Sequence, residues 1–140
     1  MRKMAKDDDE ILTDVLAEDR WWAAIRSVLT VLESLQISSV DIEFGFVVDR
    51  DIEGKRQGED RTIPLNTLVS TIELGLTEGT IERSGVSDFF IRVPRLILTI
   101  MLCNDGDIHF GSRDKALLKR IADELKGIGI VVHGPPEIVG

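Results

Sequence analysis

Strict alternation of apolar and polar residues predicts a half-buried strand over residues 40–49. The apolar positions are Val40, Ile42, Phe44, Phe46 and Val48, and the intervening positions are Asp41, Glu43, Gly45, Val47 and Asp49. A period of two with one apolar and one polar face is typical of an antiparallel sheet that packs on one side only.

A helical period predicts the segment before this strand. Apolar residues at spacings of three and four occupy residues 11–35. The pattern fits one helix, or a short helix ending near Glu18 followed by a second helix that Asp19 caps, and both alternatives stay open. Trp21 and Trp22 point about 100° apart on a helix, so we expect one of them to be partly exposed.

A second helix is predicted to begin at Thr62, because threonine is a favourable cap and Pro64 fits a first turn. Its expected buried stripe is Leu65, Leu68, Val69, Ile72 and Leu76, and Gly75 or Gly79 is expected to end it. Residues 50–61, which precede it, are polar and punctuated by glycine, and we expect a long loop there. Further strands are predicted over residues 80–84 and 86–93.

Residues 95–133 predict a strand, a tight turn, a second strand, an amphipathic helix and a last strand. Asp105-Gly106 indicates a two-residue hairpin turn, which places Leu102 opposite His109. In that register three polar residues (Asn104, Asp107 and His109) share the face of Leu98, Ile100 and Leu102, and Cys103 lies on the opposite face. Ser112 is expected to cap the helix and Gly127 to end it.

The order of elements predicts an α+β fold. We expect a mainly antiparallel sheet of four to six strands with two or three helices on one face. If the strands on either side of the last helix are parallel neighbours, the sheet is mixed. We expect residues 1–10 to form a disordered lead and residues 11–140 to form one domain.

Composition narrows the class of function. The chain of 140 residues carries a net charge of −8, which argues against binding to nucleic acid. No apolar run approaches the ~20 residues of a membrane-spanning helix, so no membrane association is expected. A charged run stands where a signal peptide has its apolar core, which indicates a cytoplasmic protein. One cysteine, Cys103, excludes an internal disulfide, and no cofactor or metal ligand set is predicted.

The strongest catalytic candidates are Asp107 and His109, because an aspartate two residues before a histidine on one strand face can orient the imidazole or share a metal with it. A second set for a metal-dependent hydrolase is Asp41, Glu43, Glu53 and Lys55. Turn chemistry and a solvated acidic strand explain both sets more simply. We therefore predict no catalytic residue and keep the hydrolase as the alternative.

The favoured hypothesis is a non-enzymatic protein-binding module. An acidic surface with an aromatic anchor suits a basic protein partner, and its residues are Trp21, Asp41, Glu43 and Asp49. The small size and acidity are typical of regulators and of immunity proteins that mask a toxin, which is an analogy of class only. A homodimer through an exposed edge strand or tryptophan is a further expectation.

Overall fold

The computed structural model describes residues 8–44, 60–79, 81, 88–103 and 105–140. These residues form one seven-stranded sheet in the order β3-β2-β4-β5-β6-β1-β7. The strands are β1 (Asp9–Thr13), β2 (Ser39–Phe44), β3 (Asp60–Pro64), β4 (Phe89–Val93), β5 (Leu98–Leu102), β6 (Ile108–Ser112) and β7 (Val132–His133). The helices are α1 (Glu18–Ser34), α2 (Leu68–Glu78), α3 (Lys115–Gly127) and the short α4 (Pro136–Val139).

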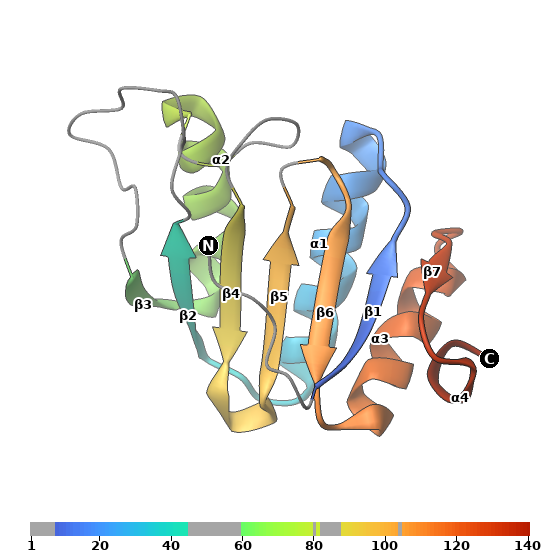
Figure 1. Cartoon of the computed structure of the whole chain (residues 1–140). Helices are drawn as coiled ribbons and strands as arrows, with labels where there is room; N and C mark the ends of the chain where they lie inside the picture. The colour runs from blue at the N-terminus through green and yellow to red at the C-terminus, as the bar shows by residue number, and fades with distance from the viewer. Residues whose placement is uncertain (1–7, 45–59, 80, 82–87, 104) are drawn as a thin grey trace.

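The molecule has two layers. Helices α1, α2 and α3 all lie on one face of the sheet, and none of the described helices covers the other face (Figure 1). The predicted α+β class with a mainly antiparallel sheet is therefore confirmed, although seven strands exceed the expected four to six. In the part of the chain that the structure describes, no helix is long and apolar enough to cross a membrane.

The hydrophobic core fills the space between the helices and the sheet. Trp21, Val28 and Leu32 of α1 pack there with the residues of the central strands that face the helices, such as Ile100 and Phe110. We call this side of the sheet the covered face and the opposite side the helix-free face. The burial of so many large side chains on the covered face provides most of the driving force for folding.

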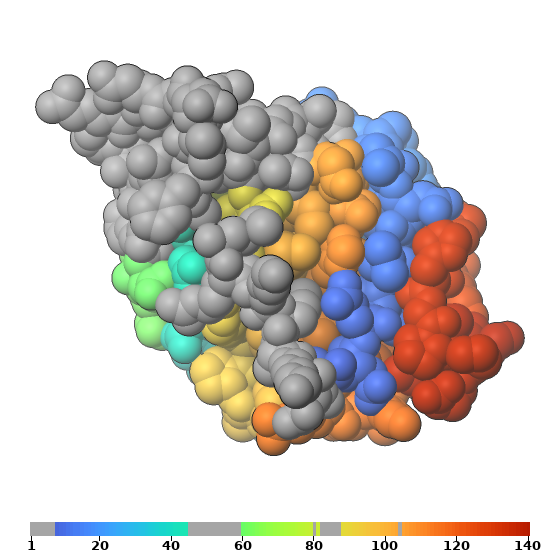
Figure 2. All heavy atoms as spheres, viewed as in Figure 1, coloured from blue at the N-terminus to red at the C-terminus, as the bar shows by residue number. Residues whose placement is uncertain are grey.

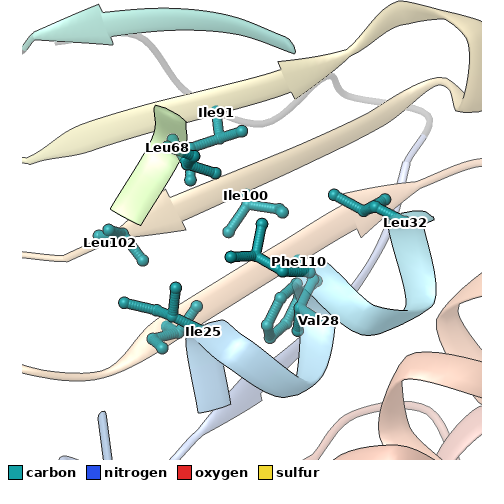
Figure 3. A pocket seen from close by; sticks show the side chains of 10 residues that line it. Ile25, Val28, Leu32, Leu68, Ile91, Ile100, Leu102 and Phe110 are labelled. Carbon is teal, nitrogen blue, oxygen red and sulfur yellow. The ribbon is translucent and has the colours of Figure 1, made fainter. Parts of the chain in front are cut away.

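A small cavity of about 20 Å³ lies in this core, between α1, α2 and the sheet (Figure 3). Its labelled lining residues come from both helices and three strands: Ile25, Val28, Leu32, Leu68, Ile91, Ile100, Leu102 and Phe110. An apolar void of this size offers a water molecule no hydrogen-bond partner and stays dry. It is a packing defect of the core and offers no polar group that could recognise a ligand.

The helix-free face carries a continuous row of side chains, because directly paired residues of neighbouring strands project to the same side. From β3 to β7 the row is Asp60, Glu43, Phe90, Met101, His109, Leu12 and His133. Both histidines of the chain thus flank Leu12 on this face.

The N-terminal segment differs from the prediction. Residues 9–13 form strand β1 between β6 and β7, and the helix begins only at Glu18. Neither a single helix over 11–35 nor two helices is correct, because Ile11 pairs with Phe110 in the sheet. Asp9 and Glu10, which the prediction placed in a disordered lead, belong to this strand. Residues 1–7 lie outside the described part of the chain.

The start of the second helix was also predicted too early. Thr62 lies in the edge strand β3, where its hydroxyl donates a hydrogen bond to Asp41 at 2.6 Å, and α2 begins at Leu68 after a 3-10 turn at residues 65–67. Gly79 ends α2 with a φ of 81°, as one of the two expected stop positions. The described residues do not include residues 45–49 of the first predicted strand, most of the 50–61 loop or, apart from Ile81, the strand predicted over 80–84.

The last strand–helix–strand unit does not make the sheet mixed. Strands β6 and β7 are separated by β1, and both pair with it in antiparallel orientation. The cap of α3 is Asp114, whose Oδ1 accepts a hydrogen bond from the Leu117 amide at 3.1 Å, while Ser112 accepts one from the Asp114 amide. The positive φ after this helix, 83°, is at Gly129 rather than at Gly127.

Candidate metal centre on the helix-free face

The hairpin between β5 and β6 sets the geometry of the candidate site. Leu102 pairs with Ile108 and Met101 with His109, one residue away from the predicted register. The turn closes through a bond from the Cys103 amide to the Asp107 carbonyl at 3.1 Å and one from the Gly106 amide to the Cys103 carbonyl at 3.2 Å. Gly106 has a φ of 94°, which suits the glycine of a three-residue hairpin loop.

This register reverses the predicted faces. A shift of one residue in one strand of a hairpin moves its side chains to the other side of the sheet. Ile108 and Phe110 therefore join Leu102 on the covered face, and His109 points to the helix-free face. Cys103 pairs with Asp107 at the turn, so it lies on the same face as Asp107 and His109 and not on the opposite one.

Three potential metal ligands converge as a result. One donor atom each of Cys103, Asp107 and His109 lies within 4.8 Å of the other two. Cys103 and Asp107 are neighbours across the hairpin, and Asp107 and His109 are two positions apart on one strand. In Figure 2, the side chains of β6 and β1 lie next to each other on this face.

The imidazole of His109 is held from both of its nitrogens. Nδ1 contacts the carboxylate of Glu10 on β1, and Nε2 lies 3.1 Å from Oδ2 of Asp107. Glu10 reaches the ring because Leu12, two residues further along β1, pairs directly with His109. The side chains of His109 and Asp107 are only 18% and 12% exposed, so solvent screens this network weakly.

The second oxygen of Asp107 has no partner. Asp107 is 8% exposed, and its Oδ1 is buried and accepts no hydrogen bond. An unpaired buried carboxylate oxygen costs free energy that a cation or a proton would recover. The orphaned oxygen is therefore the feature of this cluster that points most directly to a missing ligand.

The electrostatics favour a cation over a free thiolate. Burial raises the pKa of the Cys103 thiol well above its ordinary value, and the negative charges of Asp107, Asp88 and Asp105 raise it further. A catalytic cysteine needs the opposite environment, because nucleophiles are activated by a lowered pKa. A bound divalent cation reverses this effect, since a coordinating thiol loses its proton.

The same surroundings act on the two other donors. Burial raises the pKa of Asp107 above its ordinary value, and the neighbouring Asp105 contributes to this rise. Burial opposes protonation of His109, but the hydrogen bond to Glu10 and the charges of Asp107 and Glu10 outweigh it and raise the pKa of the imidazole. Without an ion, the raised pKa values mean that Cys103, Asp107 and His109 tend to stay protonated. A bound metal ion would supply the positive charge that these protons provide.

The residues of the predicted protein-binding surface do not gather at one place in the structure. Trp21 has 0% of its surface exposed and packs in the core, so it is not an exposed anchor; the neighbouring Trp22 is partly exposed beneath the guanidinium of Arg26. Asp41 and Glu43 do lie on the helix-free face, where Glu43 pairs with Arg92 at 2.9 Å. Asp49 lies outside the described residues.

The second hydrolase set is not brought together in the part of the chain that the structure describes. Glu53 and Lys55 lie outside it, as does Asn104 of the hairpin. The other histidine, His133, lies in a more exposed pair, with Nε2 2.6 Å from Oδ1 of Asp14. This pair has a histidine and a carboxylate like the candidate centre, and it makes a natural control for it.

Sequence reasoning found two of the cluster residues and missed Cys103 and Glu10. The signal for Cys103 was present, because only the observed register places the apolar residues of both hairpin strands on one face. Glu10 could not be found in this way, since its carboxylate contacts His109 across 99 positions of the sequence, and only the pairing of β1 with β6 brings the two together. Comparisons with protein-family models, with curated proteins and with solved structures found no match.

Proposed function

We propose that this protein binds a divalent transition-metal ion of the zinc class through Cys103, Asp107 and His109. The observation that carries the proposal is the buried Oδ1 of Asp107, which accepts no hydrogen bond although a thiol and an imidazole lie beside it. An ion bound between the three donors would compensate this desolvated carboxylate.

The donor set indicates the kind of ion. Thiolate and imidazole ligands suit zinc and related metals, whereas magnesium and calcium prefer sites built from oxygen atoms alone. Three protein ligands leave one coordination position for water or substrate, as in catalytic zinc sites. The hydrolase alternative with Asp107 and His109 therefore deserves an assay on the zinc-loaded protein.

The distances require only a small adjustment. With zinc–ligand bonds of about 2.0–2.3 Å, the donors of a tetrahedral site lie about 3.5 Å apart. The three donor atoms are at most 4.8 Å apart without an ion. Side-chain rotations that move each donor atom by about an ångström are therefore sufficient to bring them to bonding distance of one ion. Because the hairpin turn holds Cys103 and Asp107 opposite each other, the backbone needs no rearrangement.

Isothermal titration calorimetry with Zn²⁺ tests the proposal. We expect one ion per chain for the wild type and loss of this binding in Cys103→Ser, Asp107→Asn and His109→Gln. The matched control is His133→Gln, which removes the exposed histidine beside Asp14 and leaves the three donors intact. Absence of zinc binding to the wild type, or equal losses in His109→Gln and His133→Gln, would contradict the proposal.

A second proposal keeps the protein-binding function, with a basic protein as the partner. Its support is the acidic side of the helix-free face, where Asp41, Glu43 and Asp60 occupy neighbouring strands β2 and β3. Negative charge gathered on one surface speeds encounter with a positively charged partner. Asp60 is exposed, whereas Asp41, which accepts a hydrogen bond from Thr62, and Glu43, which pairs with Arg92, are partly buried.

A pull-down from the native cell tests this second proposal. We expect a basic protein to be recovered at low salt, and to be lost at high salt or with Asp41→Asn combined with Asp60→Asn. Recovery that neither change affects would contradict it. The homodimer stays a prediction from the sequence, and light scattering at high protein concentration tests it.

A further inference from the structure

We infer that Glu10 is the positioning residue of this metal centre, holding the imidazole of His109 so that Nε2 is the nitrogen that faces the ion; this rests on the proposed function. Glu10 comes from β1, whereas the three donors come from the β5–β6 hairpin. The centre is thus completed by a strand far away in the sequence.

The imidazole ring of His109 has two nitrogens, and each lies beside a carboxylate. A neutral imidazole has one N–H donor and one lone pair, and a neighbouring acceptor determines which nitrogen keeps the proton. The carboxylate of Glu10 contacts Nδ1 of His109, and Nε2 lies 3.1 Å from Oδ2 of Asp107. An ion on the Asp107 side would take the place of the proton at Nε2, and the proton that the ring then keeps is the one at Nδ1, which Glu10 accepts.

Glu10 is not itself one of the ligands. The group of donors within 4.8 Å of one another contains Cys103, Asp107 and His109 and does not include Glu10. Its carboxylate contacts the edge of the ring that carries Nδ1, away from the Nε2 edge where Asp107 lies. This is the arrangement of carboxylate, histidine and metal in which an outer carboxylate fixes the orientation of the ring and makes it a stronger ligand.

Strand β1 holds Glu10 in this place. The amide of Leu16, just after the strand, donates to the carbonyl of Gly106 in the hairpin turn at 3.0 Å, and Thr13 Oγ1 accepts from the amide of Ile108 at 3.1 Å. These two bonds and the pairing of Leu12 with His109 fix β1 against the hairpin. Glu10 is therefore preorganised to bind the ring before any ion arrives.

The test combines Zn²⁺ affinity with the nitrogen chemical shifts of His109 in the zinc-loaded full chain. For the wild type we expect a protonated Nδ1 and a coordinated Nε2 in long-range proton–nitrogen spectra. Glu10→Ala should weaken zinc binding about 10- to 100-fold, the usual effect of losing an outer-shell partner. Glu10→Gln should restore part of the affinity and the same ring tautomer, because its amide oxygen still accepts from Nδ1.

Asp14→Asn is the matched control, since Asp14 directly follows β1 and its carboxylate contacts the other histidine, His133. It should bind zinc like the wild type. If the wild type binds zinc and Glu10→Ala matches it in affinity and in nitrogen shifts, the positioning role is overturned and the metal centre stands. If the wild type binds no zinc, the proposed function and this inference are both overturned.

Discussion

The buried hydroxyl groups of the covered face and the buried carboxylate of the helix-free face differ in how far they are hydrogen-bonded. On the covered face, Thr13 donates to the Asp14 carbonyl and accepts from the Ile108 amide, and Ser112 donates to the Leu96 carbonyl and accepts from the Asp114 amide. On the helix-free face, Asp107 keeps an oxygen without a partner. Trp21 Nε1 in the core also lacks a partner, but it is a neutral donor, whereas Asp107 is a carboxylate with a thiol and an imidazole beside it, which is why we propose an ion there.

The largest difference between the faces should appear when an apolar side chain is removed. Phe110→Ala, on the covered face, should lower the free energy of unfolding by about 3–5 kcal/mol, because it leaves a cavity in the core. Met101→Ala on the adjacent strand but on the helix-free face should cost clearly less, because Met101 is only partly buried. Urea unfolding measures both; equal losses would contradict the assignment of the core to one face.

Zinc binding on the helix-free face should raise the free energy of unfolding of the chain. At a free Zn²⁺ concentration of about 100 times Kd, a ligand that binds only the folded chain adds about 2.7 kcal/mol to the free energy of unfolding. We expect this gain for the wild type and for His133→Gln, and its loss in His109→Gln, in unfolding curves with and without zinc. A gain that persists in His109→Gln would place the ion elsewhere.

Substitution of one buried polar side chain on each face should have different effects in the metal-free protein. Thr13→Val leaves the Ile108 amide without its acceptor and should cost about 1–3 kcal/mol. Asp107→Asn removes a desolvated carboxylate whose pKa is raised, so it should leave stability at neutral pH unchanged or higher. Denaturant unfolding of both variants checks this, and a loss in Asp107→Asn as large as that in Thr13→Val would refute it.

The smallest effect concerns pH. The pKa of His109 is raised in the folded chain above its ordinary value of 6.5, so protonation of His109 favours the folded state. This contribution is fully present below about 6.5 and is lost as the pH rises through the folded-state pKa. An NMR titration should show a lower midpoint for His109 in Glu10→Gln; an unchanged midpoint would mean that Glu10 does not stabilise the charged ring.

The covered face could largely be predicted from the sequence and the helix-free face could not. Periodicity finds Ile25, Leu29, Leu32, Leu68 and Ile72 because burial selects apolar residues at regular spacing. Periodicity wrongly predicts a helix at Ile11, because a short apolar run fits either period and the segment becomes a strand only by pairing with the distant β6.

The candidate site illustrates the same limit. Asp107 and His109 stand out in the sequence, but a turn of three residues instead of two decides whether Cys103 joins them. Requiring Ile108 and Phe110 to share the apolar face of Leu102 would have selected the correct register. Short motifs near a turn should therefore be read only after the hydrophobic pattern has fixed the register.

Anomalous diffraction from a crystal of the zinc-loaded protein shows directly whether an ion binds between Cys103, Asp107 and His109. At the zinc absorption edge, we expect one strong peak per chain within bonding distance of the Cys103 Sγ, an Asp107 oxygen and the His109 Nε2. A peak at His133 and Asp14, or none at these three donors, would contradict it.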